Sequence, residues 1–512
     1  MTSTQQSPAD QPRSRWTLSE VAAALGVGPR RMLTDWQAHG VSIDSRTLQP
    51  GEIFVCVRGD RTDGHEYISR ALAAGAVGLV IEEQAALVHD LGLPHPTEPI
   101  AVFVVEDGLR ALQELASYHR QRMTGKIFGI TGSNGKTSAK EMLAGLLAAL
   151  PAPPELRGDD PRNATALIGE SNVAATRGNL NNHFGVPLTL LSMPADIPYA
   201  VIEMGMNHAG EIEVLSRLAR PHAALITSIA PVHVENFPGP ASAGGGLTGI
   251  AHAKLEIVAG LPQGGPLVYP AVAFGQELAD AAATRAGAAL IRFAVGPVQH
   301  DAGLRFDWRG RPVHAPAYHN PVMASNLIGC LELLAAAGFS ETDLRAAVPR
   351  IAPRTTRRFE IVEKARPDNR PPQLLIDDSY NANPTSFGRA LEALRSLLPD
   401  GRLACFAGEM GELGPEYGPA GHREVGGIAA TEGYEFVGVC GGKSAEALKD
   451  TFAEKSAGAG GTSYHATVDD LLAALNQNGL NELARYDGIL VKGSRSARMD
   501  VLCDALRKHS YI

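Results

Sequence analysis

Apolar runs of strand length alternate with amphipathic helical stretches along most of this chain. Three such runs in the N-terminal part predict strands: "GEIFVCVRG" (51–59), "AVGLVIEE" (76–83) and "IAVFVVED" (100–107). Three stretches with helical periodicity lie around them: "TLSEVAAALG" (17–26), "YISRALAAG" (67–75) and "GLRALQELASYHRQRM" (108–123). This pattern predicts a small α/β unit that ends near Asp107.

The same alternation continues through the rest of the chain. The next predicted strands are "KIFGITG" (126–132), "YAVIEMG" (199–205) and "AALITSI" (223–229), with helices such as "AKEMLAGLLAAL" (139–150) and "EIEVLSRLAR" (211–220) between them. A third set is "QLLIDDS" (373–379), "GRLACFAGEMGE" (401–412), "YEFVGVCGG" (434–442) and "YDGILVKGS" (486–494). Strands that alternate with helices are typical of βαβ units, so we expect two further domains with mostly parallel sheets.

At 512 residues the chain is long for one hydrophobic core, and this length also favours several domains. We place a disordered tail at residues 1–15 and domains at 16–106, 107–355 and 356–512. Residues 151–171, rich in proline, glycine and charge, are predicted to form an exposed insertion of the central domain.

Charge and composition narrow the classes of ligand. A net charge of -9 gives no basic excess, which lowers the expectation of nucleic-acid or anionic-membrane binding and favours small metabolic ligands. The sequence has neither a signal peptide nor a run of ~20 apolar residues, so a cytoplasmic protein is expected. The five cysteines have no paired short spacing and are interpreted as reduced structural thiols.

The stretch "GITGSNGKTS" (129–138) predicts a phosphate-binding loop between a strand and a helix. It is one residue tighter than the common form, which would carry a glycine where Ile130 stands. Gly132 and Gly135 would let the backbone approach phosphates, Lys136 would face the β and γ groups, and Thr137 would offer a hydroxyl to Mg2+. The alternative is a glycine-rich turn with a solvated lysine.

Two further side chains follow predicted strands of the same sheet. Glu203 ends the run "YAVIE", and His233 follows "AALITSIAPV". Ligands of α/β sheets bind at the carboxyl ends of the strands, so both residues are candidates for a site beside the loop. Taken alone, a glutamate at a strand end is more often a solvated charge, and a lone histidine carries little information.

Seven stretches together resemble the Mur ligases of peptidoglycan synthesis, over about Leu18 to Leu506. They are "TGSNGKTSAKEM", "GNLNNHFGVPLTLL", "AVIEMGMNHAGEI", "HAKLEI", "IDDSYNANP", "GEMGELG" and "VKGSRSARM", in the order and spacing of that family. "DDSYNANP" with "GNLNNHFGVP" is most similar to the branch that adds D-alanyl-D-alanine to UDP-N-acetylmuramoyl-tripeptide.

The resemblance implies an ATP-dependent, ADP-forming acid–D-amino-acid (peptide) ligase with an acyl-phosphate intermediate. It implies a UDP-substrate-binding N-terminal domain, a central P-loop ATPase domain and a Rossmann-like C-terminal ligase domain. ATP, Mg2+ and a carbamylated Lys254 are the implied cofactors. The implied protein is a cytoplasmic monomer of precursor synthesis, and so of cell shape and division, with small-molecule partners and no nucleic acid.

Residue roles follow from the same resemblance. The implied catalytic residues are Lys136, Glu203, His233, Lys254 and Asp378, and the implied metal ligands are Thr137, Glu203, His233 and Lys254. Nucleotide binding is implied for Gly132, Ser133, Asn134, Gly135, Lys136, Thr137, Ser138, His319, Asn320, Asn326 and Arg358. Substrate binding is implied for Ser45, Arg46, Asn179, Asn181, Asn182, Asn381, Asn383, Lys492, Ser494 and Arg495.

The chain departs from the family pattern at several places. Ala317 and Tyr318 stand where Gly-Arg is usual, Arg357 stands for a glycine, and Pro270 to Val272 replace an Asn-Ala-Asp stretch. These changes concern the adenine and ribose contacts more than the phosphate chemistry. Two alternatives stay open at this point: a related ligase, of Mur or folylpolyglutamate type, and a nucleotide-binding regulator without catalysis.

Overall fold

The computed structural model describes residues 15–30, 33–59, 62–83, 99–157, 166–239, 245–300, 302–366, 370–458, 460–478 and 480–509. The tail predicted at residues 1–15 lies outside this range except for Arg15. Within the described ranges, no helix is both long enough and apolar enough to cross a membrane. All five cysteines are buried and none forms a disulfide.

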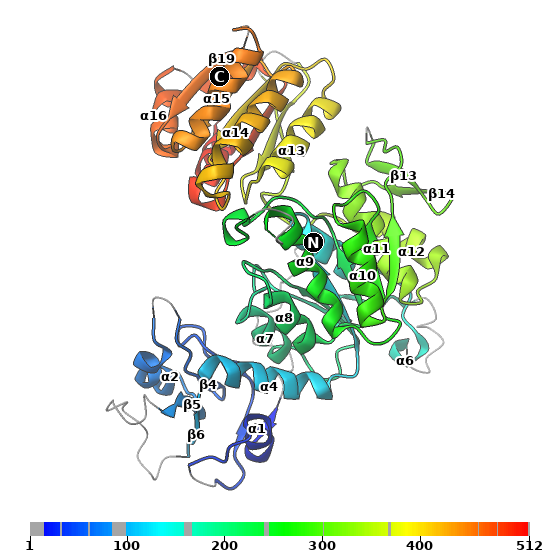
Figure 1. The fold of residues 1–512 in the computed structure, drawn as a ribbon, viewed down its shortest axis with the longest axis vertical. Coiled ribbons are helices and arrows are strands. Elements are labelled where there is room, and N and C mark those ends of the chain that lie inside the picture. Colours follow the sequence, from blue (N-terminus) through cyan, green and yellow to red (C-terminus); the bar gives the residue numbers. More distant parts are fainter. Residues whose placement is uncertain are drawn as a thin grey trace.

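Three α/β units follow one another along the long axis of the molecule, each around its own main sheet (Figure 1). The predicted α/β class with three domains is confirmed. Strands are largely parallel in all three sheets, because helices connect one strand to the next as the sequence pattern predicts. The domain boundaries given above stay predictions.

The N-terminal unit is built on a parallel sheet of order β3-β4-β5-β6. Thr17 caps the first helix, because its side chain accepts from the amide of Glu20 while the Glu20 carboxylate accepts from the Thr17 amide. The elements are β1 (Trp16–Thr17), α1 (Leu18–Leu25), β2 (Gln37–Ala38), β3 (Val41–Ser42), β4 (Ile53–Val55), α2 (Ile68–Ala73), β5 (Gly78–Glu82) and β6 (Ala101–Val105).

Helix α4 (Gly108–Arg122) joins this unit to the central one (Figure 1). Asp107 caps its first turn, so the chain turns sharply where the pattern placed a boundary. The apolar face of α4 carries Leu112 and Leu115, which belong to one continuous core with Trp16 of the first unit and Leu190 of the second. The N-terminal and central units therefore pack against each other through α4 and are not joined by a flexible linker alone.

The central sheet is entirely parallel, with strand order β12-β11-β10-β7-β9-β8. Strand β7 lies between β10 and β9, which puts the carboxyl ends of these three strands side by side. The elements are β7 (Lys126–Thr131), α5 (Lys136–Ala149), β8 (Val173–Ala175), α7 (Gly185–Leu191), β9 (Tyr199–Glu203), α8 (Glu211–Ala219), β10 (Ala223–Ile226), α9 (Gly246–Leu255), β11 (Pro266–Pro270), α10 (Gln276–Ala286), β12 (Ala289–Phe293), α11 (Val322–Ala336) and α12 (Glu341–Ala347).

Both faces of this sheet are covered by helices, because side chains alternate between the faces. On β7, Ile127 packs into the core with α4, α7, α8, α9 and α10, whereas Phe128 packs against α5, α11 and α12. Helix α5, which starts at the phosphate loop, buries Leu143 and Leu146 completely on that second face. The strand before the phosphate loop, β7, and the helix after it, α5, are therefore both anchored in the core.

A hairpin that the sequence reading missed extends the second face. Strands β13 (Leu304–Trp308) and β14 (Arg311–Ala315) pair antiparallel, and Arg309 and Gly310 between them both have positive φ. Trp308 is buried and donates from Nε1 to Glu332 Oε1 at 2.8 Å. The hairpin therefore packs as part of the central core.

The C-terminal unit has strand order β15-β16-β20-β17-β18-β19, in which only the edge strand β15 is antiparallel to its neighbour. Helices α13, α14 and α15 cover one face, and α16 and α17 cover the other. The elements are β15 (Glu360–Lys364), β16 (Gln373–Asp378), α13 (Pro384–Leu397), β17 (Leu403–Gly408), α14 (Gly414–Thr431), β18 (Phe436–Cys440), α15 (Lys443–Lys455), β19 (Gly461–His465), α16 (Val468–Asn478), β20 (Gly488–Lys492) and α17 (Met499–Lys508).

The insertion expected at 151–171 is less exposed than predicted where the structure describes it. Ala152 and Ile168 are buried in the central core, and Pro151 pairs with Leu167 as an isolated bridge. A short helix, α6 (Pro154–Arg157), precedes residues 158–165, which lie outside the described range. Composition alone missed the two apolar anchors that close this segment onto the core.

The packing of α5 yields a stability test. Leu143→Ala should destabilise the central unit by about 2–5 kcal/mol, because it leaves a cavity under the helix that carries the phosphate loop. Val214→Ala, on an exposed helical position, is the control and should change stability by less than about 0.5 kcal/mol. Urea unfolding measures both; equal effects would contradict this description of the core.

Candidate active site

The phosphate loop is a tight turn that other segments hold in place. Gly132 and Gly135 have φ values of 148° and 83°, and a Cβ atom at these positions would lie 2.0 Å from Thr227 Oγ1 and 2.6 Å from Asn326 Oδ1. Thr227 Oγ1 donates to the carbonyl of Asn134 at 2.5 Å. Only glycine fits both positions, because the backbone conformation and the space each exclude a side chain.

The strand beside β7 supplies most of this support. Ser133 Oγ donates to the carbonyl of Ala230 at 2.9 Å and accepts from the Ala230 amide, while Ser228 Oγ accepts from the Asn134 amide at 2.9 Å. These residues follow β10, whose carboxyl end lies next to the loop in the parallel sheet. The loop therefore presents its remaining backbone amides at the start of α5, where the helix dipole attracts anions.

Lys136 is the first residue of α5 and lies folded over the loop. Its Nζ donates to the Gly132 carbonyl at 2.7 Å. Burial lowers the pKa of Lys136, the charge of Glu203 raises it, and that of Arg358 lowers it further. A cation held this way is desolvated and close to the anion-binding turn, so phosphate oxygens would stabilise its charge.

Glu203 ends β9 on the other side of the loop and is almost wholly buried. Its Oε1 accepts from Asn181 Nδ2 at 2.8 Å, and its amide donates to Thr176 Oγ1 at 2.9 Å. Its Oε2 is buried and has no hydrogen-bond partner in the described part of the chain. A buried carboxylate oxygen without a donor is a site for a cation.

His233 and Lys254 lie close to Lys136. Burial, followed by the charges of Lys136 and Lys254, lowers the pKa of His233 to about 4, which keeps its imidazole neutral at neutral pH. Lys254 is buried in α9, and burial together with the charge of Lys136 lowers the pKa of its amine well below the usual value. The ring of His233 therefore presents a lone pair, and burial disfavours the charged form of the Lys254 amine.

The C-terminal unit adds a buried ion pair. Lys492, which ends β20, donates from Nζ to Asp378 Oδ2 at 2.6 Å and to the carbonyl of Asn381 at 3.0 Å. Asp378 ends the neighbouring strand β16, and its Oδ1 accepts from the Phe359 amide at 3.1 Å. Burial raises the pKa of Asp378 and the charge of Lys492 lowers it.

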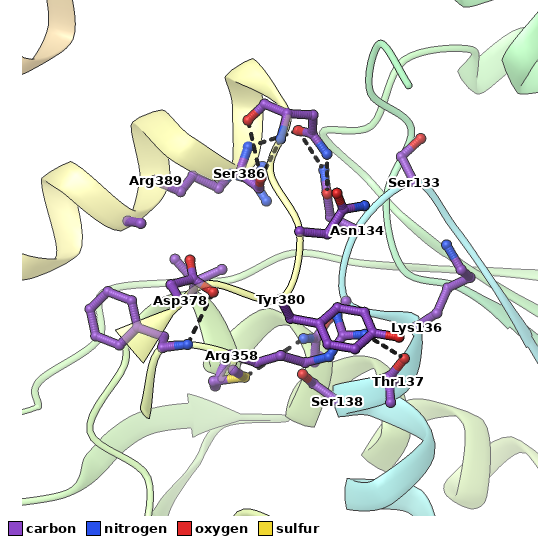
Figure 2. Close-up of a pocket in the computed structure, with 18 of the residues that line it drawn as sticks. Ser133, Asn134, Lys136, Thr137, Ser138, Arg358, Asp378, Tyr380, Ser386 and Arg389 are labelled. Atoms are coloured by element: carbon purple, nitrogen blue, oxygen red, sulfur yellow. Dashed lines mark hydrogen bonds between the residues drawn. The ribbon is translucent and has the colours of Figure 1, made fainter. Parts of the chain in front are cut away.

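Two side chains of the C-terminal unit, Asn383 and Arg358, contact the phosphate loop and the first turn of α5 (Figure 2). Asn383, the N-cap of α13, donates from Nδ2 to Asn134 Oδ1 at 2.6 Å. Arg358 donates to Thr137 Oγ1 at 3.1 Å, and its guanidinium lies 4.0 Å from the centre of the Tyr380 ring. The contact uses one lone pair of the Thr137 hydroxyl and leaves the second for a ligand.

Most of these groups line a cavity of about 250 Å³ between the two units, but His233 and Lys254 are not on its wall. Residues of the predicted site on its wall are Ser133, Asn134, Gly135, Lys136, Thr137, Ser138, Asn179, Asn181, Glu203, Asn320, Asn326, Arg358, Asp378, Asn381, Asn383 and Lys492. Residues up to 359 positions apart in sequence are thereby gathered around one anion-binding turn, since the wall runs from Ser133 to Lys492.

A second cavity of about 370 Å³ adjoins the first on the far side of Asn320 and Arg358. His319 lines it, together with Ala317 and Tyr318, the two residues that depart from the family pattern. Burial raises the pKa of the Tyr318 hydroxyl, which therefore stays protonated. A planar, partly apolar ligand attached to the phosphates would reach this second cavity.

Some predicted site residues lie elsewhere. Ser45 and Arg46 are on the N-terminal unit, where Arg46 pairs with Asp44 at 2.6 Å. Asn182 accepts from the Gly185 amide at 2.9 Å and so supports the start of α7. The remaining two belong to the C-terminal turn: Ser494 accepts from the Gly411 amide at 2.8 Å, and Arg495 is exposed and pairs with Asp500 at 3.3 Å.

Several residues around the cavity were not predicted. Tyr380, Ser386 and Arg389 line it, and Glu412 contacts His233. Tyr380 lies inside the stretch "DDSYNANP" and Glu412 inside "GEMGELG". Both motifs were recognised from the sequence, but these two residues were not selected. Arg389 follows Ser386 by three residues on α13, and only the helix register brings it to the cavity.

Mg2+ would fit beside the loop. In the described ranges, no group of three or more His, Cys, Asp or Glu side chains is arranged to hold a metal ion by itself. The fit depends instead on mixed donors: the Thr137 hydroxyl, the unpartnered Oε2 of Glu203 and the neutral imidazole of His233. Since Mg2+ in nucleotide sites takes one or two carboxylates and completes its shell with phosphate and water oxygens, this donor set is sufficient.

On the side of the central unit, the cavity has an anion-binding turn, the buried Lys136 and the carboxylate of Glu203, which is suited to a cation. On the side of the C-terminal unit, it has the charged side chains of Asp378 and Lys492. Such a site can hold a polyphosphate and present its terminal group to a second molecule in the cavity. It can also exclude water when the two units are docked.

Known proteins match nearly the whole chain. Residues 130–329 match the Mur ligase middle domain, 357–495 the Mur ligase, glutamate ligase domain, and 37–120 the Mur ligase family, catalytic domain. The chain is 32% identical over 476 residues to the UDP-N-acetylmuramoyl-tripeptide–D-alanyl-D-alanine ligase of Bacillus subtilis, covering 90% of this chain and 92% of the relative.

Solved structures agree in fold. The crystal structure of MurF from Acinetobacter baumannii has a TM-score of 0.78 at 25% identity and covers 98% of this chain and 100% of that chain. MurF ligase from Thermotoga maritima, in complex with ADP, has a TM-score of 0.70 at 23% identity, with 92% and 97% covered.

The buried lysine of α9 gives a pH-dependent prediction. The pKa of Lys254 is lower in the folded protein than its ordinary 10.5, so the unfolded chain binds the proton more tightly and the lysine destabilises the fold at neutral pH. Lys254→Met should therefore raise the unfolding free energy in carbon-dioxide-free buffer at neutral pH.

This difference between variant and wild type should shrink as the pH rises toward 10.5, because the unfolded chain then also loses the proton. Denaturant unfolding across this pH range measures it. A Met variant that is less stable than wild type at neutral pH would contradict the assignment of Lys254 as a desolvated amine.

Proposed function

The chain belongs to the Mur ligase family, and from this we propose that it joins D-alanyl-D-alanine to UDP-N-acetylmuramoyl-tripeptide with conversion of ATP to ADP and phosphate. The relative in Bacillus subtilis carries this activity in its name and aligns over nine-tenths of the chain. The reaction belongs to the synthesis of peptidoglycan precursors.

One observation carries this proposal: the phosphate loop and the stretch "DDSYNANP" of the C-terminal unit line the same cavity. A nucleotide-binding protein without a second substrate would not need the ion pair of Asp378 and Lys492 opposite its loop. A ligase needs such a wall, since the acceptor amine must meet the activated carboxylate there. The ADP found with the Thermotoga maritima structure supports ATP as the nucleotide.

The first step activates a carboxylate. A carboxylate does not react with an amine in water, because it is a poor electrophile and its oxygen is a poor leaving group. Lys136 and the loop amides stabilise the negative charge that develops as the γ-phosphoryl group moves from ATP to the terminal carboxylate of the tripeptide. The acyl phosphate that results has phosphate as a leaving group.

In the second step the neutral amine of D-alanyl-D-alanine attacks the acyl carbon, loses a proton, and phosphate leaves. An α-amino group has an ordinary pKa of about 8, so enough free amine is present near neutral pH. The docked C-terminal unit keeps water from the acyl phosphate, because Asn383 and Arg358 close the cavity over the loop. Asp378 orients Lys492 toward the same cavity.

Mg2+ would be held by Thr137, Glu203 and His233, and it would neutralise charge on the phosphate oxygens. Lys254 would enter this site as its carbamate. A neutral buried amine is the form that reacts with carbon dioxide, and the carbamate changes a cation that repels a metal into an anion that attracts one.

The remaining assignments are part of the same proposal. His319, Asn320 and Asn326 bind the nucleotide, and Ser45 and Arg46 bind the uridine side of the other substrate. Asn179, Asn181, Asn182, Asn381, Asn383, Lys492, Ser494 and Arg495 serve the peptide substrates. The protein works as a cytoplasmic monomer, and its product serves cell-wall biogenesis, cell shape and cell division.

The direct test measures phosphate release from ATP with UDP-N-acetylmuramoyl-tripeptide, with and without D-alanyl-D-alanine, followed by mass analysis of the product. We expect release that requires both substrates and a product heavier by one dipeptide less water. Turnover with a single amino acid but not with the dipeptide would assign a sister ligase. If no acceptor caused phosphate release from ATP, the protein would be a nucleotide-binding regulator.

The phosphate loop is tested by Lys136→Ala. Loss of the lysine that donates to the loop carbonyl of Gly132 should lower turnover by roughly a hundredfold to a thousandfold or more, with the fold retained. Lys443→Ala, on the exposed first turn of α15, is the matched control and should leave turnover unchanged. Near-normal turnover of the Lys136 variant would remove the loop from the mechanism.

A further inference from the structure

A side-chain contact between His233 and Glu412 joins the central and C-terminal units beside the phosphate loop. Nδ1 of His233 lies 3.1 Å from Oε2 of Glu412, and the two side chains are 21% and 53% exposed. His233 belongs to the turn after β10, whereas Glu412 lies in the loop between β17 and α14. The charges of Glu412 and Lys136 also act on each other, so Glu412 reaches the phosphate side of the cavity.

The loop that carries Glu412 is fixed firmly to its own unit. The Met410 amide donates to Nε2 of the buried His422 at 3.0 Å, and the Gly411 amide donates to Ser494 Oγ at 2.8 Å. The Ser494 amide in turn donates to the carbonyl of Glu409 at 3.0 Å. Glu412 therefore moves with the C-terminal unit as a whole and cannot follow His233 independently.

Both partners adopt a backbone conformation that side chains disfavour. The φ angles of His233 and Glu412 are 53° and 63°. Two residues later, Gly414 packs so closely on the central unit that a Cβ atom there would lie 3.2 Å from that of Glu235. Strained residues of this kind persist where surrounding contacts determine them, and here two of them face each other across one interface.

We propose that Glu412 is a positioning residue for His233, completing a carboxylate–histidine–metal arrangement whose carboxylate and histidine come from different units. The proposal rests on the proposed function, which makes His233 a metal ligand. With Nδ1–H donated to Glu412, the ring keeps Nε2 as its lone pair and its orientation is fixed. Outer carboxylates of this type set the affinity of the metal site.

Because the carboxylate arrives with the C-terminal unit, metal binding at His233 and docking of that unit are coupled. Docking strengthens the metal site by orienting the ring, and by thermodynamic reciprocity the metal stabilises docking by the same factor. The enzyme would then hold its metal most tightly only when the cavity is closed against water. Asn383 and Arg358 contact Asn134 and Thr137 from the same unit, but neither of them orients the ring of His233.

The test titrates the full chain with Mn2+ in the presence of ADP and follows free Mn2+ by electron paramagnetic resonance, so no turnover is involved. The Mn2+ site of interest is identified as the one whose affinity for Mn2+ falls in the variant His233→Ala. Glu412→Ala should weaken this site by roughly 10- to 100-fold, and Glu412→Gln by less, because its amide oxygen still accepts from Nδ1–H. Glu235→Gln, an equal charge change on the adjacent exposed residue, should leave it unchanged.

The double variant His233→Ala/Glu412→Ala should bind Mn2+ as His233→Ala does, because Glu412 acts through the ring. Small-angle scattering should show that Mn2+ with ADP compacts the wild type more than Glu412→Ala. Unchanged Mn2+ affinity in Glu412→Ala, additive losses in the double variant, or no effect of His233→Ala would each overturn the proposal. Failure of the proposed function would appear separately, as wild-type protein without ligase activity.

Discussion

The backbone turn from Gly132 to Gly135 is the constraint on which the rest of the structure depends. Thr227 and Ser228 bind the carbonyl of Asn134, and Ala230 binds the side chain of Ser133. The amides of Ser133 and Asn134 are bonded to Ser228, so the turn offers its remaining amides to a phosphate. This support requires the end of β10 beside β7, and the unpartnered carboxylate of Glu203 requires β9 on the other side. The placement of β7 between β10 and β9 therefore supplies the groups that support the turn on both sides.

Burial around the turn has an electrostatic consequence. Burial lowers the pKa of both Lys136 and Lys254, and the charge of Lys136 lowers that of Lys254 further, so the surroundings of both amines disfavour their charged forms. A bound polyphosphate relieves this, and a carbamate on Lys254 would relieve it further. The ion pair of Lys492 with Asp378 avoids the same difficulty because each charge has its partner within the C-terminal unit.

Much of this could be predicted from the sequence, because the local signals were strong. Apolar strands ending at Thr131, Glu203 and Ile226 predicted the parallel central sheet, and "GSNGKTS" predicted the turn. The β13–β14 hairpin was missed although Leu304, Phe306 and Trp308 alternate, since its turn places Arg309 rather than Asn or Asp at positive φ. The edge strand β15 is too polar to resemble a strand of the sheet interior.

Contacts between units could not be predicted, because no pattern along the chain encodes how two rigid units dock. Glu412 and Tyr380 belong to motifs that were recognised, yet their roles depend on the approach of the C-terminal unit. The structure also gives different roles to side chains that are neighbours in the sequence and that were both assigned from the sequence to the same substrate site. Asn181 holds Glu203, whereas its neighbour Asn182 supports the start of α7.

The central claim is that the loop transfers a phosphoryl group to a carboxylate inside the cavity shared by the two units. The most direct measurement uses UDP-N-acetylmuramoyl-tripeptide labelled with oxygen-18 in its terminal carboxylate and analyses the released phosphate by mass spectrometry. This account predicts that each phosphate carries one oxygen-18 atom, since the acyl phosphate passes its bridging oxygen to the leaving group. Unlabelled phosphate accompanying amide formation would contradict it.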